Sequence, residues 1–370
     1  MKRICIYVTY DLENIVDDYV GYMLQALRRV ADYLVVVCNY AYISRGIENV
    51  RPYADKIYYR ENIGFDAGAY KDALCKYLGW EVIGGYDELL LVNDSFFGPF
   101  YSLEDLFERM KGTSIDYWGM TRCPEVELAD GNTYGTHIQS YFLTLRSQVL
   151  RDKGFRTFWE DMPYPASLLQ AIITFEIKIN NLLQDLGFTG SALTDMCPGQ
   201  WKLEKNENPH ILYPMELIRD AGVPILKKKC LRLVNKRFDD AIGALSFIRE
   251  ECAYDICLIE EHLRRVGKGG NFMGIDTFYA SHSRIFIYGA GFYGRNVAEY
   301  FEYKGWTFEK FIVTDADAGQ EDCVSMEEAG ITGNDGIIIA VGNRKAFMEI
   351  LRMVEMQCGK DQIFNRDIIL

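Results

Sequence analysis

Short runs of uninterrupted apolar residues constrain the fold of this chain more than any other feature. Arg3–Thr9 and Tyr33–Cys38 are such runs, and Val16–Val30 between them repeats apolar residues at helical spacing. Strands that are apolar along their whole length need cover on both faces, which is typical of parallel strands with helices on either side. We therefore predict an α/β fold with an open, mostly parallel sheet flanked by helices.

The same pattern continues farther along the chain. Ile57–Tyr59 and Glu88–Val92 are predicted strands, and a helix is predicted between them over Asp66–Leu78. The runs then become shorter. Tyr141–Leu145 predicts one more strand, and Ala166–Leu186 predicts a helical region.

Glycines mark the end of this first region. Lys236–Val266 has the pattern of a helical segment, and Gly267–Gly274 holds four glycines. A second, smaller β-α-β unit follows, with strands predicted at Arg284–Tyr288, Phe311–Thr314 and Gly336–Val341 and helices at Phe292–Tyr303 and Arg344–Met356. We predict a first α/β domain over residues 1–235, a helical linker over 236–280 and a small Rossmann-like domain over 281–370.

Composition excludes several classes of partner and site. The 40 Lys and Arg against 53 Asp and Glu give a formal charge of -13, which repels nucleic acid. The 10 cysteines are scattered without a Cys-x-x-Cys pair, which indicates reduced thiols rather than a zinc site. No apolar run approaches the roughly 18 residues that cross a bilayer, and the N-terminal run is too short for a signal peptide. We therefore expect a cytoplasmic protein.

Two polar segments follow predicted strands. Residues 60–70 read Arg-Glu-Asn-Ile-Gly-Phe-Asp-Ala-Gly-Ala-Tyr, and residues 93–99 read Asn-Asp-Ser-Phe-Phe-Gly-Pro. Glycines at a strand-to-helix turn let backbone amides approach a phosphate or sugar. Ligands of open α/β sheets bind at the carboxyl ends of strands, where Asp94 can hold a metal or a sugar hydroxyl. The alternatives are a tight connection capped by Asp66 and a turn formed by Asn93, Asp94 and Ser95.

Together these segments resemble the rhamnan synthesis protein F family of glycosyltransferases, whose members carry Arg-Glu-Asn-x-Gly-Phe-Asp-x-Gly-Ala-Tyr followed by Asn-Asp-Ser-x-x-Gly-Pro. The match covers residues 3–235 and continues through residues 137–142, Glu176, Gly187-Phe188, Asn208-Pro209, Pro224–Lys227 and Leu231-Arg232. Two positions depart from the family pattern. Thr9 stands where a histidine is common, and Ala67 stands where an aromatic residue is usual.

The resemblance implies a GT-A-like fold that transfers a deoxyhexose, L-rhamnose, from a nucleotide sugar such as dTDP-L-rhamnose. The acceptor would be a saccharide or a lipid-linked saccharide of a surface polysaccharide or lipopolysaccharide, at the inner face of the membrane. Asn93-Asp94-Ser95 occupies the place of the Asp-x-Asp motif, so Asp94 would hold Mg²⁺ or Mn²⁺ against the donor diphosphate. The implied donor-binding residues are Arg60, Asn62, Gly64, Asp66, Asn93, Asp94 and Ser95.

Glu176 is the candidate catalytic base, because an inverting transfer needs a carboxylate to take the proton of the acceptor hydroxyl. Asp94 is the second candidate catalytic residue. His137, Gln139 and Ser140 are candidates for acceptor binding. The alternatives are a solvated helix face for Glu176, ordinary strand positions for Gln139 and Ser140, and a structural hydrogen-bonding role for His137.

A basic run stands out in this acidic chain. It consists of Lys227, Lys228 and Lys229, followed by Arg232, Lys236 and Arg237. Such a run can draw a protein to an anionic membrane face or a lipid-diphosphate acceptor, which suggests peripheral membrane association. A solvated helix face is the favoured interpretation.

The C-terminal region carries a glycine fingerprint. Gly289 and Gly291 follow a predicted strand, and Gly294 lies in the first turn of the predicted helix after it. Asp315 follows the next strand at the distance of a ribose contact. The region resembles the small Rossmann-like sugar-nucleotide-binding domains attached to some bacterial sugar-modifying enzymes. Nucleotide binding by these four residues and a purely architectural domain are both open.

Three functions compete at this point. A nucleotide-sugar-dependent glycosyltransferase is favoured, and a protein that binds nucleotide sugars without turnover is the alternative. An NAD-dependent oxidoreductase built on the C-terminal glycines is weaker, because no segment supplies its catalytic half.

Overall fold

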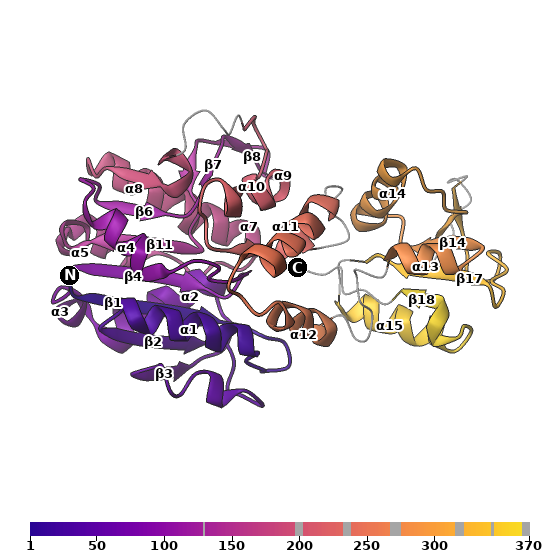
Figure 1. Ribbon diagram of the computed structural model, residues 1–370, viewed down its shortest axis with the longest axis horizontal. Helices are drawn as coiled ribbons and strands as arrows, with labels where there is room; N and C mark the ends of the chain where they lie inside the picture. Colours follow the sequence, from indigo (N-terminus) through magenta and orange to yellow (C-terminus); the bar gives the residue numbers. More distant parts are fainter. Residues whose placement is uncertain are drawn as a thin grey trace. The chain divides into compact units, whose positions relative to one another are not determined.

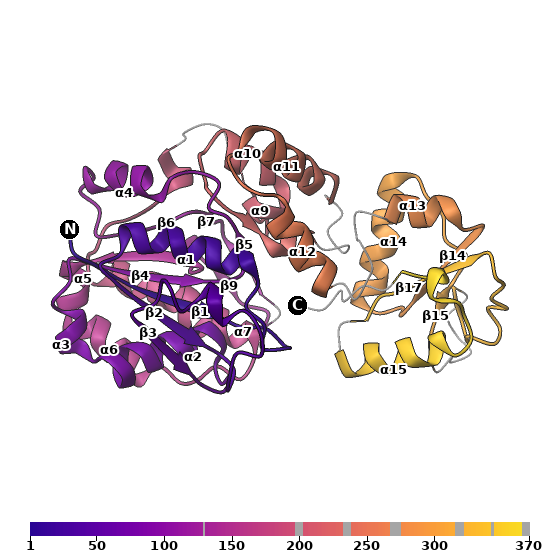
Figure 2. The same cartoon turned by 60° about the horizontal axis from the view of Figure 1, so that its bottom comes forward.

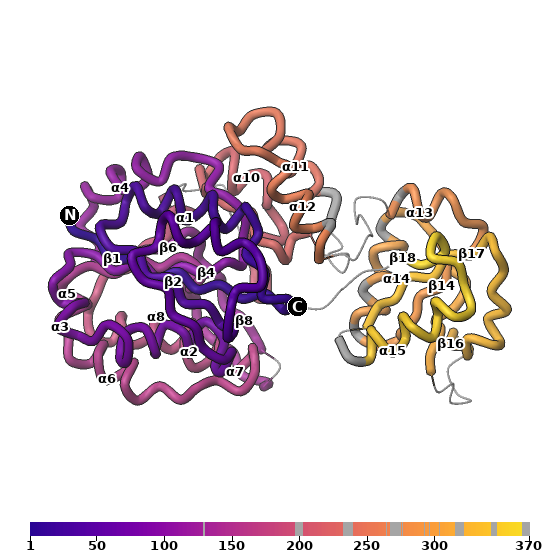
Figure 3. Tube along the Cα trace, turned by 90° about the horizontal axis from the view of Figure 1, so that it is seen from below, coloured from indigo at the N-terminus to yellow at the C-terminus, as the bar shows by residue number. Residues whose placement is uncertain are grey.

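The computed structural model describes residues 1–128, 130–196, 203–231, 238–266, 275–314, 322–341 and 344–364. The chain forms two compact units (Figure 1). Unit 1 comprises Met1–Lys227 and Phe247–Tyr254, and unit 2 comprises Lys228–Ser246 and Asp255–Leu370. Figure 3 traces the chain through both. The three-part division at 235 and 280 stays a prediction.

Unit 1 is built on a seven-stranded sheet of order β12-β6-β11-β4-β1-β2-β3. Its strands are β1 (Arg3–Thr9), β2 (Tyr33–Cys38), β3 (Lys56–Tyr59), β4 (Glu88–Asn93), β6 (Tyr117–Gly119), β11 (Phe142–Arg146) and β12 (Gly190–Ala192). Neighbours β3, β2, β1 and β4 are parallel, as are β6 and β12, while β11 is antiparallel to β4 and β6. The predicted α/β fold with a mostly parallel sheet is confirmed.

Helices cover both faces of this sheet (Figure 2). The helices of unit 1 are α1 (Asp18–Val30), α2 (Phe65–Asp72), α3 (Trp80–Ile83), α4 (Leu103–Lys111), α5 (Ser147–Arg151), α6 (Lys153–Asp161), α7 (Leu168–Ala171), α8 (Lys178–Asp185), α9 (Pro209–Leu212) and α10 (Pro214–Arg219). Short strand pairs lie outside the main sheet: β5 (Phe96–Phe97) with β13 (Leu226–Lys227), β7 (Arg122–Cys123) with β10 (His137–Ile138), and β8 (Val126–Glu127) with β9 (Thr133–Tyr134).

The period of two along each strand divides the core of unit 1 between these faces. Ile4, Ile6 and Val8 of β1 pack in one cluster with residues of α2, α6 and α8. Their neighbours Cys5 and Tyr7 are also buried, so β1 has no solvent-facing side. This explains why its sequence is apolar throughout rather than alternating.

Two predicted helices contain a wider turn than a regular α-helix. The segment predicted as a helix over Asp66–Leu78 is α2 followed by a π-helical turn at Ala73–Leu78. The region after α7 has a second π-helical turn at Ile172–Ile177, which runs into α8. π-Helical turns are rare in proteins, and those that occur are often found at functional sites. The second one in this chain carries Glu176.

Unit 2 contains a five-stranded sheet of order β16-β15-β14-β17-β18, in which every pair is parallel. Its strands are β14 (Arg284–Tyr288), β15 (Phe311–Ile312), β16 (Cys323–Val324), β17 (Asp335–Ile339) and β18 (Ile363–Phe364). The helices are α11 (Phe238–Glu251), whose residues 247–251 count with unit 1, α12 (Cys257–Val266), α13 (Ile275–Ser281), α14 (Phe292–Lys304) and α15 (Arg344–Glu355). The single helical segment predicted over Lys236–Val266 is therefore interrupted after Glu251.

The sheet of unit 2 is also covered on both faces. Phe286, Ile337 and Ile339 pack with Phe347 and Leu351 of α15, and α14 lies on the opposite side in Figures 1 and 2. Across the described parts of both units, no helix is long and apolar enough to cross a membrane.

Candidate functional site

The ends of β1 and β4 are tied together by Asp94. Its backbone N–H donates to the carbonyl of Val8 at 3.1 Å. Its Oδ2 accepts from the hydroxyl of Thr9 at 2.9 Å and from the backbone N–H of Tyr10 at 3.0 Å. Because these are the central parallel strands, Asp94 lies at the carboxyl edge of the sheet, where ligands of such folds bind.

A second set of contacts ties Asn93 to the start of α2. The Asn93 amide donates to Asp66 Oδ2 at 2.7 Å, and Asn93 Oδ1 accepts from the Ser95 hydroxyl at 2.5 Å. Asp66 Oδ1 also accepts from the N–H of Ala67. The structure therefore joins four predicted donor-binding residues, Asp66 and the Asn93-Asp94-Ser95 turn, into one polar surface.

The loop before α2 has an unusual backbone. Gly64 has a φ of 79° and Phe65 a φ of 57°, both in the left-handed region. An aromatic residue there costs of order 1–3 kcal/mol and persists only when its surroundings hold it. Asn39 helps to hold Phe65 in this conformation, because its side-chain amide donates to the carbonyl of Phe65 at 3.1 Å. Asn62 lies exposed in the same loop.

Arg60 holds this loop from the inside. Its guanidinium donates to Asp72 at 2.8 Å, to Asn39 Oδ1 at 2.6 Å and to the carbonyl of Ile63 at 2.6 Å. The Arg60 side chain is 6% exposed. The Arg60 guanidinium thus hydrogen-bonds to groups of the protein itself. Its predicted contact with the donor stays a prediction.

The predicted acceptor side forms a second cluster. Glu176 Oε2 accepts from the Ser140 N–H at 2.8 Å and from the Ser140 hydroxyl at 2.6 Å. Glu176 Oε1 lies 3.4 Å from His137 Nε2, and the two side chains are 18% and 3% exposed. Glu176 is therefore held in place with one edge still open to solvent, rather than lying on a solvated helix face.

The pKa values of this pair move apart. Burial alone would raise the pKa of Glu176. The hydrogen bond and charge of His137, together with the two hydrogen bonds from Ser140, instead lower this pKa to about 2. Burial would lower the pKa of His137, but Cys123 and Glu176 raise it to about 10. These shifts favour an ion pair at neutral pH between the buried His137 and the partly buried Glu176.

Asp66 behaves in the opposite way. Burial raises its pKa above the ordinary value, against the hydrogen bonds from Asn93 and Ala67, and the negative charge of Glu176 adds to the rise.

Gln139 is directed elsewhere. Its Oε1 accepts from the buried hydroxyl of Thr121 at 2.7 Å, and the same hydroxyl contacts Tyr141 and His210. Gln139 is 6% exposed, so in this structure it supports the core beside the site. Its role in acceptor binding stays a prediction.

The structure adds a residue that sequence reasoning placed on a solvated helix face. Lys227 is 8% exposed, and its ammonium donates to the Ser95 hydroxyl at 2.6 Å. The interpretation of Lys227 as part of a solvated basic face is therefore wrong, because strand pairing of β13 with β5 brings it to the Asn93-Asp94-Ser95 turn. Three members of that run, Arg232, Lys236 and Arg237, lie outside the described residues.

The fit of a divalent cation can be judged from the oxygens present. Among the described residues, no group of three or more His, Cys, Asp and Glu side chains could hold a metal ion. Asp94 uses Oδ2 on Thr9 and Tyr10, which leaves Oδ1 for a ligand, while both oxygens of Asp66 accept hydrogen bonds. These residues fit a cation that arrives with a diphosphate and takes most of its ligands from it and from water.

The C-terminal fingerprint adopts the expected strand-to-helix connection. Gly289, with a φ of 110°, follows β14, and Gly291 precedes α14. A Cβ on Gly294 would collide with the carbonyl of Gly289, so the close approach of helix and strand requires glycine there. Asp315 lies outside the described residues.

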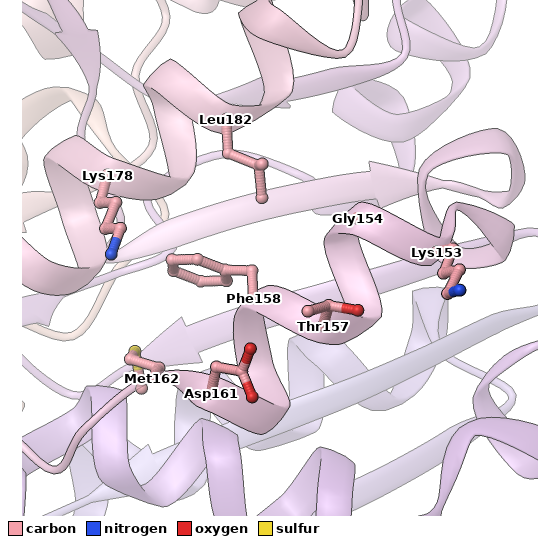
Figure 4. A pocket seen from close by; sticks show the side chains of 8 residues that line it. All are labelled: Lys153, Gly154, Thr157, Phe158, Asp161, Met162, Lys178 and Leu182. Atoms are coloured by element: carbon pink, nitrogen blue, oxygen red, sulfur yellow. The ribbon is translucent and has the colours of Figure 1, made fainter.

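Two cavities have none of the predicted site residues in their linings. One of about 390 Å³ in unit 2 is lined by residues at the ends of β14 and β15, including Tyr288 and Thr314. The other, of about 490 Å³, lies between α6 and α8 (Figure 4). There Phe158 and Leu182 form an apolar centre, with lysines at its ends and none of the predicted site residues in its lining.

The comparisons with known proteins identify the family. Residues 34–279 match the profile of the family described as Rhamnan synthesis protein F. The chain belongs to the rhamnan synthesis protein F family. Within the curated proteins it is similar to "Uncharacterized protein y4gN" of Sinorhizobium fredii, with 26% identity over 160 residues. That match spans 43% of this chain and 40% of the relative.

Solved structures give weaker likenesses. A 4-diphosphocytidyl-2C-methyl-D-erythritol synthase has 13% identity and a TM-score of 0.34, covering 60% of this chain and all of its own. Core-mannan synthase A from Aspergillus fumigatus, in its Mn/GDP form, has 9% identity and a TM-score of 0.27, covering 51% of this chain and 71% of its own.

Proposed function

We propose that this member of the rhamnan synthesis protein F family is a nucleotide-sugar-dependent glycosyltransferase. The observation that carries the proposal is the polar surface at the carboxyl edge of the unit 1 sheet. Asp94 ties β1 to β4 there, and Asn93 ties the same turn to Asp66 at the start of α2. In open α/β sheets this edge is the ligand-binding edge. The family profile covers Asp66, Asn93 and Asp94.

The reaction is proposed to be a single displacement. The acceptor hydroxyl oxygen attacks the anomeric carbon, and the bond from that carbon to the donor phosphate oxygen breaks with its electrons leaving on the nucleoside diphosphate. The acceptor proton passes to a carboxylate, for which Glu176 is the proposed base. A divalent cation, when bound, would neutralise charge on the diphosphate, and Asp94 would hold it through Oδ1.

The substrate proposal follows from the family. The donor is proposed to carry a deoxyhexose, L-rhamnose on dTDP, and the acceptor to be a saccharide or lipid-linked saccharide of a surface polysaccharide at the inner face of the membrane. These identities rest on the family name and on the motif resemblance.

The first prediction tests turnover itself. The full chain, supplied with dTDP-L-rhamnose and a rhamnan or lipid-linked oligosaccharide, should release dTDP faster with the acceptor than without it. Coupled detection of the nucleoside diphosphate measures both rates, and UDP- and GDP-sugars serve as comparison donors. Tight donor binding without release of nucleotide, with or without acceptor, would favour the alternative of a non-catalytic binding protein.

The second prediction concerns unit 2. A chain ending at residue 280 keeps both segments of unit 1 and all the transferase motifs, so it should bind the donor with unchanged affinity. Calorimetric titration of the full and shortened chains measures this, with circular dichroism as the control for folding. A shortened chain that folds but binds no nucleotide sugar would move the donor site to unit 2, where Gly289, Gly291 and Gly294 lie.

A further inference from the structure

Two motifs far apart in the sequence form one structural feature in unit 1. β13 pairs with β5 in antiparallel register, so that Lys227 lies opposite Phe96 and Leu226 opposite Phe97. The carbonyl of Pro224 accepts from the N–H of Phe100 at 2.9 Å. A Cβ on Gly98 would collide with that carbonyl, so glycine is required for the two segments to meet.

This pairing places the Lys227 ammonium beside the Asn93-Asp94-Ser95 turn. It donates to the Ser95 hydroxyl at 2.6 Å and lies 3.9 Å from the centre of the Tyr141 ring. A cation over a tyrosine face is favourable, and a largely buried one gains more from it than an exposed one. Ser95 and Tyr141 therefore help to hold the ammonium beside this turn.

The Tyr141 hydroxyl is held by two buried polar side chains. Its hydroxyl contacts His210 Nε2 at 2.9 Å and the hydroxyl of Thr121 at 3.0 Å, and all three side chains are buried. These contacts fix the position of the hydroxyl oxygen and therefore the direction in which the ring extends. The position of Lys227 at the sheet edge is thus determined by rigid neighbours rather than by its own flexible side chain.

The charges around this edge need a fixed cation if a diphosphate is to bind. Asp66, Asp94 and Glu176 lie on the surrounding elements, in a chain whose formal charge is -13. Arg60 is engaged by Asp72 and Asn39. The charge of Lys227 already acts on Asp66, whose pKa it lowers against the effect of burial.

We infer that Lys227 binds the donor diphosphate directly and stabilises the nucleoside diphosphate as it leaves. The inference rests on the proposed function and adds to it the residue that supplies positive charge independently of any metal ion. A lysine is suited to this contact because its ammonium is a compact charge with three N–H donors.

The test compares phosphate contact with general support of the site. UDP, GDP and dTDP are titrated into the wild-type full chain, and the tightest is then titrated, together with its nucleoside, into Lys227→Met and Lys227→Arg. Lys227→Met should weaken nucleoside diphosphate binding about 10- to 100-fold, as expected for one lost charge-assisted hydrogen bond. Nucleoside binding should be unchanged, and Lys227→Arg should recover part of the loss.

Lys71→Met is the matched control. The Lys71 ammonium also donates to protein oxygens, the carbonyls of Glu160 at 2.8 Å and Met162 at 2.6 Å, but it belongs to α2 and contacts none of the strand-end residues. This variant should bind both ligands as the wild type does. Thermal unfolding of every variant shows which have folded.

The outcomes separate the two proposals. A wild-type chain that binds no nucleoside diphosphate would overturn the proposed function and this inference together. If the wild type binds but Lys227→Met binds equally well, or loses nucleoside and diphosphate affinity by the same factor, only the role of Lys227 is overturned. The loss should persist in EDTA, and a loss seen only with Mg²⁺ present contradicts direct contact.

Discussion

Asp94→Asn is expected to lower the rate of sugar transfer by about three powers of ten, with little change in thermal stability. The asparagine side chain keeps an oxygen that can accept from Thr9 and Tyr10, so the link between β1 and β4 survives. The lost carboxylate charge removes the proposed metal ligand, and metal stabilisation of the departing diphosphate is worth several kcal/mol, about tenfold for each 1.4 kcal/mol. Steady-state transfer kinetics at saturating donor measure the effect.

Asp116→Asn is the matched control for that variant. Asp116 is also half-buried, and it accepts a hydrogen bond from the backbone N–H of Thr189 at 2.9 Å. It directly precedes β6, so it lies at the amino ends of the parallel strands, opposite the proposed site. It should leave transfer unchanged. A chelator should inhibit the wild type reversibly. Unaltered activity of Asp94→Asn would remove the Asn93-Asp94-Ser95 turn from the catalytic proposal.

Chelator resistance together with a raised Michaelis constant in Asp94→Asn would have a different meaning. Asp94 would then act through hydrogen bonds to the donor sugar. The charge of the leaving group would then fall to Lys227, whose ammonium lies beside the Asn93-Asp94-Ser95 turn.

The strands that hold the site could be predicted because their burial on both faces leaves an unbroken apolar signal. β1 and β2 have the predicted limits, Arg3–Thr9 and Tyr33–Cys38. The predicted strand at Tyr141–Leu145 is β11, displaced by one residue, but its antiparallel direction had no signal in its composition. Direction depends on which neighbours a strand meets, and a single run of apolar residues does not encode them.

The site residues could be predicted only where they are neighbours in the sequence of the strand that positions them. Asn93, Asp94 and Ser95 follow a strand directly, so their place at its carboxyl end was expected. The contacts of Arg60 and Lys227 could not be predicted in this way. Arg60 lies next to the glycine turn yet points to Asp72, whereas Lys227 reaches the turn through a two-residue pairing more than a hundred positions away.

Glu176→Gln is expected to lower turnover by two to four powers of ten, the usual contribution of a general base, while donor affinity changes little. Glutamine keeps an oxygen for the Ser140 N–H and hydroxyl, but it removes the charge that pairs with His137. Breaking a buried ion pair typically destabilises a protein by about 3–5 kcal/mol, so lost stability has to be separated from lost catalysis.

His137→Gln provides that separation, because it breaks the same pair and leaves the carboxylate. Equal losses of turnover in Glu176→Gln and His137→Gln would make the pair a positioning device, whereas a much larger loss in Glu176→Gln supports the base. The pH profile adds a second measure. With its pKa lowered to about 2, Glu176 stays ionised in mildly acidic solution, so the wild type should show no loss of kcat/KM from this group until strongly acidic pH.

Removing His137 removes the charge and hydrogen bond that lower the pKa of Glu176, leaving burial to raise it. The acid limb of His137→Gln should therefore move to higher pH if Glu176 accepts the proton. An acid limb that lies above the ordinary carboxyl range in the wild type, and does not move in this variant, would instead assign the proton transfer to Asp66, whose pKa burial raises.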